Sequence, residues 1–268
     1  MACRNVYRVP TGDEDGHMPK SMITVPAVAK NVNRLLFGAD SATRADVLLQ
    51  NNIREFEWVV RNKIYPNFYG RYLTGKDCLT KEEINFLHDK GCKIAPMCKD
   101  ICTKVTEYEG RMLGKKLALR AQDLQIPTGT AIFLELGEEE AVKRDFLRGY
   151  AIALMEEGYT PGFKANTDAA FKFDREFSRG LLTENSTFRR CMIWAAAPII
   201  DKFNGIRTAH LIHPDRWMPF APSGMTRNEI AVWQYGKNAH PIEDDNGGET
   251  FFNLNLVRNE QVIIEKMF

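Results

Sequence analysis

The segment AIFLELGEEEAVKRDFLRGYAIALMEEGYTPGFKA (residues 131–165) decides the fold class, because it reads as a strand, a helix and a second strand in succession. Its two ends, 131–136 and 161–165, are short and mostly apolar runs without alternation, as in strands buried on both faces. The stretch Glu138–Glu157 between them opens with three glutamates, which stabilise a helix N-terminus, and ends before Gly158. Such a unit places its two strands parallel to each other.

The same alternation continues along the chain on both sides of this unit. Eight short apolar runs are predicted as strands: Leu35–Asp40, Phe68–Tyr72, Ile94–Met97, Ala131–Leu136, Pro161–Ala165, Met192–Ala195, Ile230–Gln234 and Phe251–Leu256. Further helices are predicted at Ala45–Lys63, Thr80–Lys90, Val105–Leu124, Asp168–Ser178 and Ala197–Phe203, with a long loop at Arg207–Asn228. Eight parallel strands joined by crossovers predict an α/β fold, a (β/α)8 TIM-type barrel, which typically takes about 250 residues.

An open, doubly wound sheet is the main structural alternative. Such sheets usually bind a nucleotide through a glycine-rich first turn. The first predicted strand ends in the stretch Gly38–Ala42, which lacks G-x-G-x-x-G, and no GxxxxGK[ST] loop is present. The pattern therefore favours a closed barrel over residues 34–268, preceded by an N-terminal arm, residues 1–33, that is rich in proline, glycine and charge.

The charge balance bears on possible partners. The 268 residues include 36 basic and 35 acidic side chains, a net charge of +1, so no general attraction to nucleic acid or to a membrane is expected. The N-terminal residues lack the apolar core of a secretory signal, and no run approaches the roughly 20 apolar residues of a membrane span. We expect a cytoplasmic protein unless lysis or leaderless export releases it, and its oligomeric state stays open.

Metal and cofactor chemistry has little support in the sequence. Six cysteines are scattered along the chain: Cys3, Cys78, Cys92, Cys98, Cys102 and Cys191. They form no C-x-x-C pair, although a disulfide within the group from Cys78 to Cys102 stays possible. His210 and His213 are three residues apart without an H-E-x-x-H pattern. We therefore predict no metal and no cofactor.

Polar and aromatic side chains gather where the predicted strands end, which is where β/α barrels build their active sites. Asp40 ends the first strand, and Glu135 interrupts the apolar fourth one. A helix-capping or ion-pair role stays open for Asp40 and Glu135, and a role in core packing stays open for Trp194 and Trp233. The remaining candidates are Arg71, Tyr72, Asn166, Asp168, Trp194, Trp233, Gln234 and Asn253. Asn253 and Asn255 alternate with leucines and should both face the interior.

This mixture of residue types suits carbohydrate. Sugar C–H faces stack on aromatic rings, and hydroxyls pair with carboxylates and amides. Glycosidic cleavage needs one protonated carboxyl and a second carboxylate. Asp40 and Glu135 lie on different strands and are expected to meet at one rim, with burial raising the pKa of one carboxyl so that it serves as the acid.

The ordered motifs resemble the glycoside-hydrolase-like barrel domain of bacterial and phage cell-wall proteins, which is related to family 25 lysozymes. The matching stretches span about residues 34–257: FGADSAT, YGRYLT, CLTKEEINFLHDKGCKIAPM, LQIPTGTAIFLEL, FLRGYAIALMEEGYTPGFKAN, IWAAAP, AVWQYG and FNLNL. The resemblance implies a peptidoglycan-type substrate. It assigns Asp40 to the first-strand aspartate and Glu135 to the first acid of a D-x-E-type pattern, whose second acid falls on Gly137. Asn253 stands where such barrels often have an aspartate.

Two hypotheses follow. The leading one is a lysozyme-like glycoside hydrolase acting on cell-wall polysaccharide, with Glu135 as general acid/base and Asp40 as second carboxylate. Arg71, Tyr72, Asn166, Asp168, Trp194, Trp233, Gln234 and Asn253 would contact the sugar. The alternative is a non-catalytic carbohydrate-binding or cell-wall-interaction barrel that uses the same residues.

Overall fold

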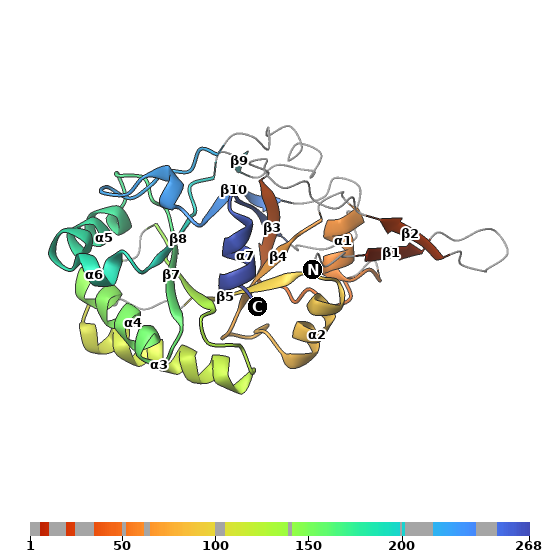
Figure 1. The fold of residues 1–268 in the computed structure, drawn as a ribbon, viewed down its shortest axis with the longest axis horizontal. Coiled ribbons are helices and arrows are strands. Elements are labelled where there is room, and N and C mark those ends of the chain that lie inside the picture. Colours follow the sequence, from red (N-terminus) through yellow and green to blue (C-terminus); the bar gives the residue numbers. More distant parts are fainter. Residues whose placement is uncertain are drawn as a thin grey trace.

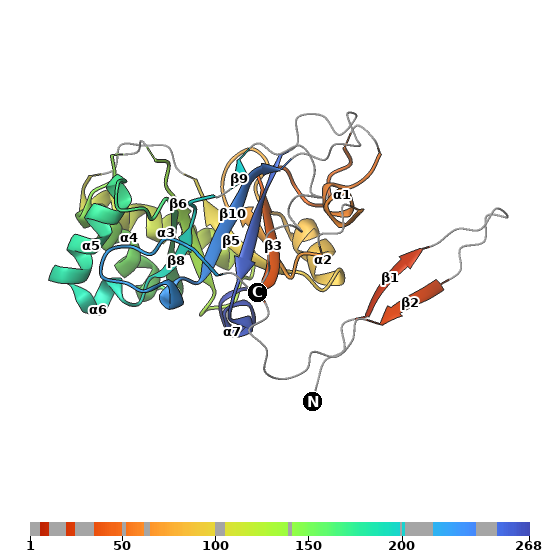
Figure 2. The same ribbon diagram turned by 90° about the horizontal axis from the view of Figure 1, so that it is seen from above.

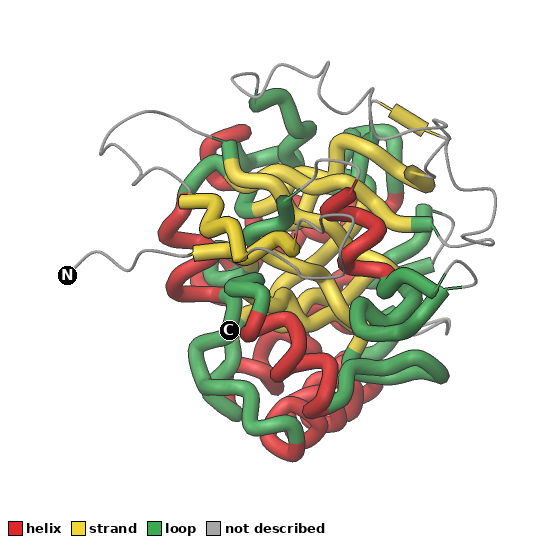
Figure 3. The backbone as a smooth tube through the Cα atoms, turned by 90° about the vertical axis from the view of Figure 1, so that its right-hand side faces the viewer, coloured by secondary structure: helices red, strands yellow, loops and turns green. Residues whose placement is uncertain are grey.

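The computed structural model describes residues 6–10, 20–24, 35–49, 52–61, 65–99, 105–138, 141–198, 200–201, 217–239 and 251–268. Within them, eight strands close into a barrel in the order β11-β3-β4-β5-β6-β7-β8-β10, and β10 pairs with β11. Helices lie on the outside of these strands (Figure 3). The barrel is the predicted fold class.

All eight predicted strands are present, with small shifts at their ends. Their bounds are β3 Leu36–Ser41, β4 Phe68–Tyr72, β5 Lys93–Cys98, β6 Ala131–Glu135, β7 Thr160–Ala165, β8 Met192–Ala195, β10 Val232–Ala239 and β11 Phe252–Val257. Inside the predicted N-terminal arm, β1 Val6–Pro10 and β2 Lys20–Thr24 pair as an antiparallel hairpin.

The direction of the last strand differs from the prediction of eight parallel strands. Strand β11 runs antiparallel to both of its neighbours, β3 and β10, and lies beside them in Figure 2. Strand β10 continues to Ala239, and twelve residues separate it from β11. A connection of this length could also make a parallel crossover, so the pairing of β11 with β3 and β10 decides its direction.

The helices are α1 Glu55–Arg61, α2 Lys81–Asp89, α3 Glu107–Asp123, α4 Arg144–Glu156, α5 Lys172–Thr183, α6 Asn185–Phe188 and α7 Glu260–Lys266. Helices α3 to α6 gather on one side of the barrel, and α1 and α2 on the other (Figure 1). Helix α2 is capped by Thr80, whose side chain accepts from the Glu83 amide.

Several predicted helix boundaries are wrong. The helix expected at Ala45–Lys63 begins only at Glu55, because the preceding residues form turns and the Ala45 amide donates to the Glu83 carboxylate, 2.7 Å away. Helix α4 begins at Arg144 and α5 at Lys172, both later than predicted.

The segment predicted as a helix at Ala197–Phe203 holds the short strand β9, Ile200–Asp201, which pairs with β10. In the predicted loop Arg207–Asn228, residues 217–226 are irregular and a 3-10 turn follows at Arg227–Glu229. Residues 139–140, 199 and 202–216 lie outside the described part of the chain.

The interior of the barrel is filled with aromatic side chains. The rings of Phe68 and Phe133 both pack edge-on against Trp194, with centroids 5.9 Å and 5.2 Å from it. Glycines opposite them make room, because a Cβ at Gly38 would lie 2.2 Å from the Phe68 ring and one at Gly162 would lie 2.5 Å from Phe133. The barrel is therefore packed inside rather than hollow.

The two ends of the barrel differ. Helix α7 lies at the N-terminal end of the parallel strands, where Lys266 contacts Thr160 and the final residue, Phe268, pairs with Ile94. Polar side chains gather at the C-terminal end instead. This end is where a functional site is expected in a β/α barrel.

Candidate functional site

Polar side chains from six strands meet at the C-terminal end of the barrel. We call the rim cluster the set Asp40, Tyr72, Lys99, Glu135, Lys164 and Asn253. Asp40 and Glu135 point inward because they alternate with Ala39 and Leu134, which pack in the outer apolar layer. The structure thus places the two predicted carboxylates at one rim.

Lys164 joins the two carboxylates. It comes from β7, and its side chain is 1% exposed. The Nζ atom lies 2.6 Å from Asp40 Oδ2 and 3.5 Å from Glu135 Oε2. It also lies over the Trp194 ring, 5.0 Å from the centroid. A single buried ammonium group is therefore shared by both acids.

Asp40 is saturated with hydrogen bonds. Besides Lys164, Asn253 Nδ2 donates to Oδ2 over 2.9 Å and Asn255 Nδ2 donates to Oδ1 over 2.7 Å. The residue is 1% exposed. The helix-capping role considered for Asp40 does not apply, because turns and not a helix follow β3, and there the Ser41 hydroxyl accepts from the Thr43 amide. Asp40 therefore anchors β7 and β11 to β3 rather than facing outward.

Glu135 is the carboxylate of the rim cluster that reaches the surface, with 18% of its side chain exposed. The Tyr72 hydroxyl donates to its Oε2, and Lys99 Nζ lies 3.7 Å from Oε1. Burial raises the pKa of Glu135, but Lys164, Tyr72 and Lys99 together lower it further, so that the pKa lies below its usual value. The expectation that burial keeps this carboxyl protonated is wrong.

The protonation states of Lys164 and Tyr72 complement the ionised Glu135. Burial lowers the pKa of Lys164, yet Asp40 and Glu135 raise it above the usual value, so the ammonium stays charged. Burial and the nearby carboxylates raise the pKa of Tyr72, which keeps its hydroxyl protonated as a donor. Two carboxylates and the two ammonium groups of Lys99 and Lys164 therefore give the rim cluster no net charge.

Three other predicted residues lie close by without forming part of the cluster. Asn166, in the loop after β7, donates to Glu138 Oε1 over 2.8 Å. Asp168 accepts from the Ala170 amide over 2.9 Å and so stabilises the turn before α5. Gln234 is buried opposite Asn255 on the inner face of the β10–β11 pair.

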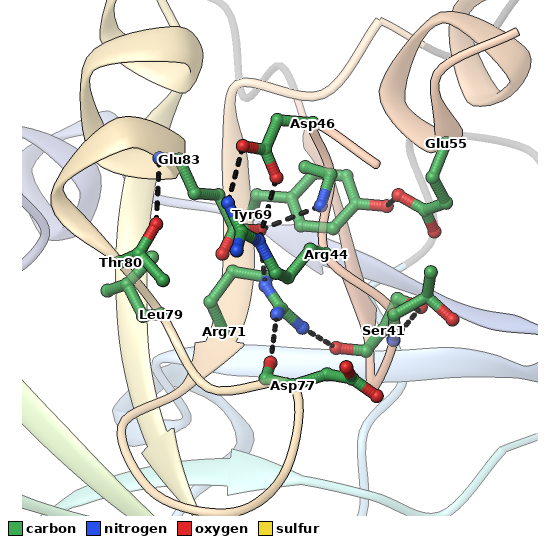
Figure 4. A network of polar contacts seen from close by, with 12 residues as sticks. Ser41, Arg44, Asp46, Glu55, Tyr69, Arg71, Asp77, Leu79, Thr80 and Glu83 are labelled. Carbon is green, nitrogen blue, oxygen red and sulfur yellow. Dashed lines mark hydrogen bonds and ion pairs between the residues drawn. The ribbon is translucent and has the colours of Figure 1, made fainter. Parts of the chain in front are cut away.

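Arg71 is not placed to bind a ligand, contrary to the prediction. It is fully buried on the outer face of β4, between the barrel and α2 (Figure 4). Its guanidinium donates to Glu83 Oε1 over 2.6 Å and to the backbone carbonyls of Ser41 and Asp77. Because Tyr72 points inward, the adjacent residue on the strand points outward.

The two tryptophans are core residues, and their predicted role as sugar-stacking platforms is wrong. Trp194 is fully buried and donates its indole N–H to Asn255 Oδ1 over 2.9 Å. Trp233, also buried, packs in the outer layer against Trp217 and Tyr235. Neither ring has a face open to solvent.

A second group of buried polar side chains lies between the barrel strands and helices α1 and α2 (Figure 4). The Tyr69 hydroxyl donates to Glu55 at the start of α1, next to the ion pair of Arg71 and Glu83. Burial raises the pKa of Glu55 to about 7, although Tyr69 and Arg71 act in the opposite direction. This group links two helices to the barrel.

Sequence reasoning missed the centre of the site. Lys164, Lys99 and Asn255 are not among the predicted site residues. Lys164 interrupts the apolar strand PGFKA in the same way that Glu135 interrupts IFLEL. A charged residue inside a strand that is buried on both faces could therefore have identified Lys164 as a site residue.

Metal ligands do not assemble in the part of the chain that the structure describes, where no group of three or more His, Cys, Asp or Glu side chains could hold an ion. Cys78, Cys92 and Cys191 are free thiols. Cys102, His210 and His213 lie outside the described residues. Among the described helices, none has both the length and the apolar character needed to cross a membrane.

Comparison with known proteins yields structural neighbours alone. No protein-family model and no curated protein matches the chain. An uncharacterized protein of B. stearothermophilus is 25% identical with a TM-score of 0.70, and the match covers 87% of this chain and 100% of that one.

Two further solved structures are more distant. The endolysin ply40 catalytic domain, from bacteriophage P40 of Listeria monocytogenes, is 12% identical with a TM-score of 0.48, over 87% of this chain and 98% of that one. A family GH25 lysozyme from Aspergillus fumigatus is 11% identical with a TM-score of 0.47, over 87% and 99%. At these identities and TM-scores, no property of either structure is transferred to this chain.

Proposed function

We propose that the rim cluster binds an uncharged, hydroxyl-rich glycan of the bacterial cell-wall type. The observation that carries this proposal is the balanced set of donors and acceptors around the ionised, partly exposed Glu135. A cluster without net charge has no general preference for phosphates or cations. It offers a carboxylate, a phenol, an ammonium group and an amide, the groups that pair with sugar hydroxyls.

Recognition is better supported than cleavage by the predicted pair of acids. Glu135 lacks the proton that a general acid must donate. Asp40 is saturated and buried, and the Lys164 ammonium stands between the two carboxyl groups, where a two-carboxylate glycosidase must hold the scissile bond. The assignment of Glu135 as acid and Asp40 as second carboxylate is therefore replaced by the binding hypothesis.

One observation keeps a hydrolase as the second candidate. An ionised and partly exposed carboxylate such as Glu135 is suited to act as a base or a nucleophile, the role of the second acid in glycoside hydrolysis. The proton would then have to come from a group other than Asp40 or Glu135.

Calorimetric titration with chitin oligosaccharides and soluble peptidoglycan fragments tests the proposal. Binding is expected for the wild type and is expected to weaken in Glu135→Gln, whereas Glu57→Gln, at a partly exposed position of α1, serves as a control that retains binding. The proposal fails if none of these glycans binds. New reducing ends released between about pH 4 and 8 by the wild type, and lost in Glu135→Gln, would establish the hydrolase instead.

A further inference from the structure

We propose that Lys164, anchored by Asp40, is the positioning residue that holds Glu135 as an anion at the rim, and so sets the pH range over which the site recognises its glycan. The second half of this inference rests on the proposed function. The first half concerns the protein without ligand and can be tested separately.

The geometry gives Lys164 little freedom. Asp40 holds the ammonium at 2.6 Å and is itself fixed by two asparagines of β11. The Trp194 ring lies against the other side of the ammonium group. A lysine side chain usually loses much rotamer entropy when it is fixed, and here the fold has already imposed that cost. The charge therefore stays next to Glu135 whether or not a ligand is present.

Four groups face Glu135 from four strands. Tyr72 comes from β4, Lys99 follows β5, Lys164 belongs to β7, and Asp40 of β3 stands behind Lys164. Lys99 is about half exposed, so water and salt screen its charge. Lys164 is buried, and its attraction for a neighbouring carboxylate is much less screened. Of these groups, Lys164 should dominate the ionisation of Glu135.

Removing Lys164 alone would leave Asp40 buried without its counter-charge, which can prevent folding. The double variant Asp40→Asn/Lys164→Met removes both charges and keeps one carbonyl oxygen that can accept from one of the two asparagines. Lys164→Arg is the conservative variant that retains a cation. Comparison of the wild type, the double variant and Lys164→Arg separates the loss of the positive charge from the loss of the lysine side chain.

The decisive measurement is the pH titration of the Glu135 carboxyl carbon by NMR in the ligand-free protein. We expect the midpoint to rise by roughly one to three pH units in the double variant, because the buried cation beside Glu135 is removed. Lys164→Arg should remain close to the wild type. An unchanged midpoint in a folded double variant would overturn the role of Lys164.

Glycan binding is then measured against pH in the same proteins. The acid limb of the binding curve should follow the Glu135 midpoint and move to higher pH in the double variant. If the NMR midpoint moves while the binding curve does not, the control of recognition by Lys164 is overturned. If the midpoint moves and no glycan binds to any of the proteins, the proposed function alone fails.

Discussion

The Trp194 indole N–H donates to Asn255 Oδ1 over 2.9 Å, inside the barrel. The same Asn255 side chain also donates, from its Nδ2 atom, to Asp40 Oδ1 over 2.7 Å. The aromatic core and the rim cluster are therefore joined by one amide, which satisfies a buried donor on one side and a buried carboxylate on the other.

This relationship predicts that Asn255→Leu destabilises the protein by about 2–4 kcal/mol, because two buried polar groups lose a partner. Asn253→Leu, at a partly exposed position, should cost less, since water can replace its hydrogen bond to Asp40. Urea unfolding followed by circular dichroism measures both. Equal losses for the two variants would contradict the central position given to Asn255.

The raised pKa of Glu55 predicts a stability that falls as pH rises. Its pKa is about 7 in the folded protein against an ordinary 4.5, so the folded state binds more protons between these values. Its contribution is fully favourable below about pH 4.5 and is lost as pH rises to about 7, a change of about 3 kcal/mol.

Glu55→Gln should remove most of this dependence and should be more stable than the wild type at pH 8. Unfolding free energies measured between pH 5 and 8 test it, with Glu57→Gln on the same helix as the control. Burial also raises the pKa of Glu83, so a smaller slope of the same sign should remain. A wild-type stability that is constant over this range would show that Glu55 titrates normally.

Arg71 is predicted to matter for stability and not for ligand binding. Arg71→Met leaves Glu83 buried without its counter-charge and should cost about 3–5 kcal/mol. Adding Glu83→Leu should recover much of this loss, because the unpaired charge is then removed. Thermal unfolding of the wild type, the single variant and the double variant tests whether the double variant is more stable than Arg71→Met. Any folded variant should bind glycan like the wild type.

Tyr72 and Trp233 should show opposite behaviour. Tyr72→Phe removes the hydroxyl that faces Glu135 at the rim and is expected to weaken glycan binding by about 1 kcal/mol, with little change in stability. Trp233→Phe removes buried apolar surface and is expected to lower stability while leaving affinity unchanged. Calorimetric affinity and urea unfolding, measured on both variants, would reveal the reverse pattern if Trp233 were a sugar platform.

The sequence by itself determined the eight barrel strands and, in β11, which side chains face inward. Strands buried on both faces must be apolar nearly throughout, so the eight runs stood out. A single acid in such a run, as in Glu135, is conspicuous, and the alternation of Asn253 and Asn255 with leucines correctly placed both amides in the interior.

The tertiary structure alone decided what these residues do. The direction of β11 depends on its pairing with β3 and β10, which is not a local property. Whether Arg71 or Tyr72 faces the interior depends on the register of β4, because a shift of one residue exchanges the faces. The ionisation of Glu135 depends on a lysine 29 positions further along the chain, since charges interact through space, and only closure of the barrel brings them within reach.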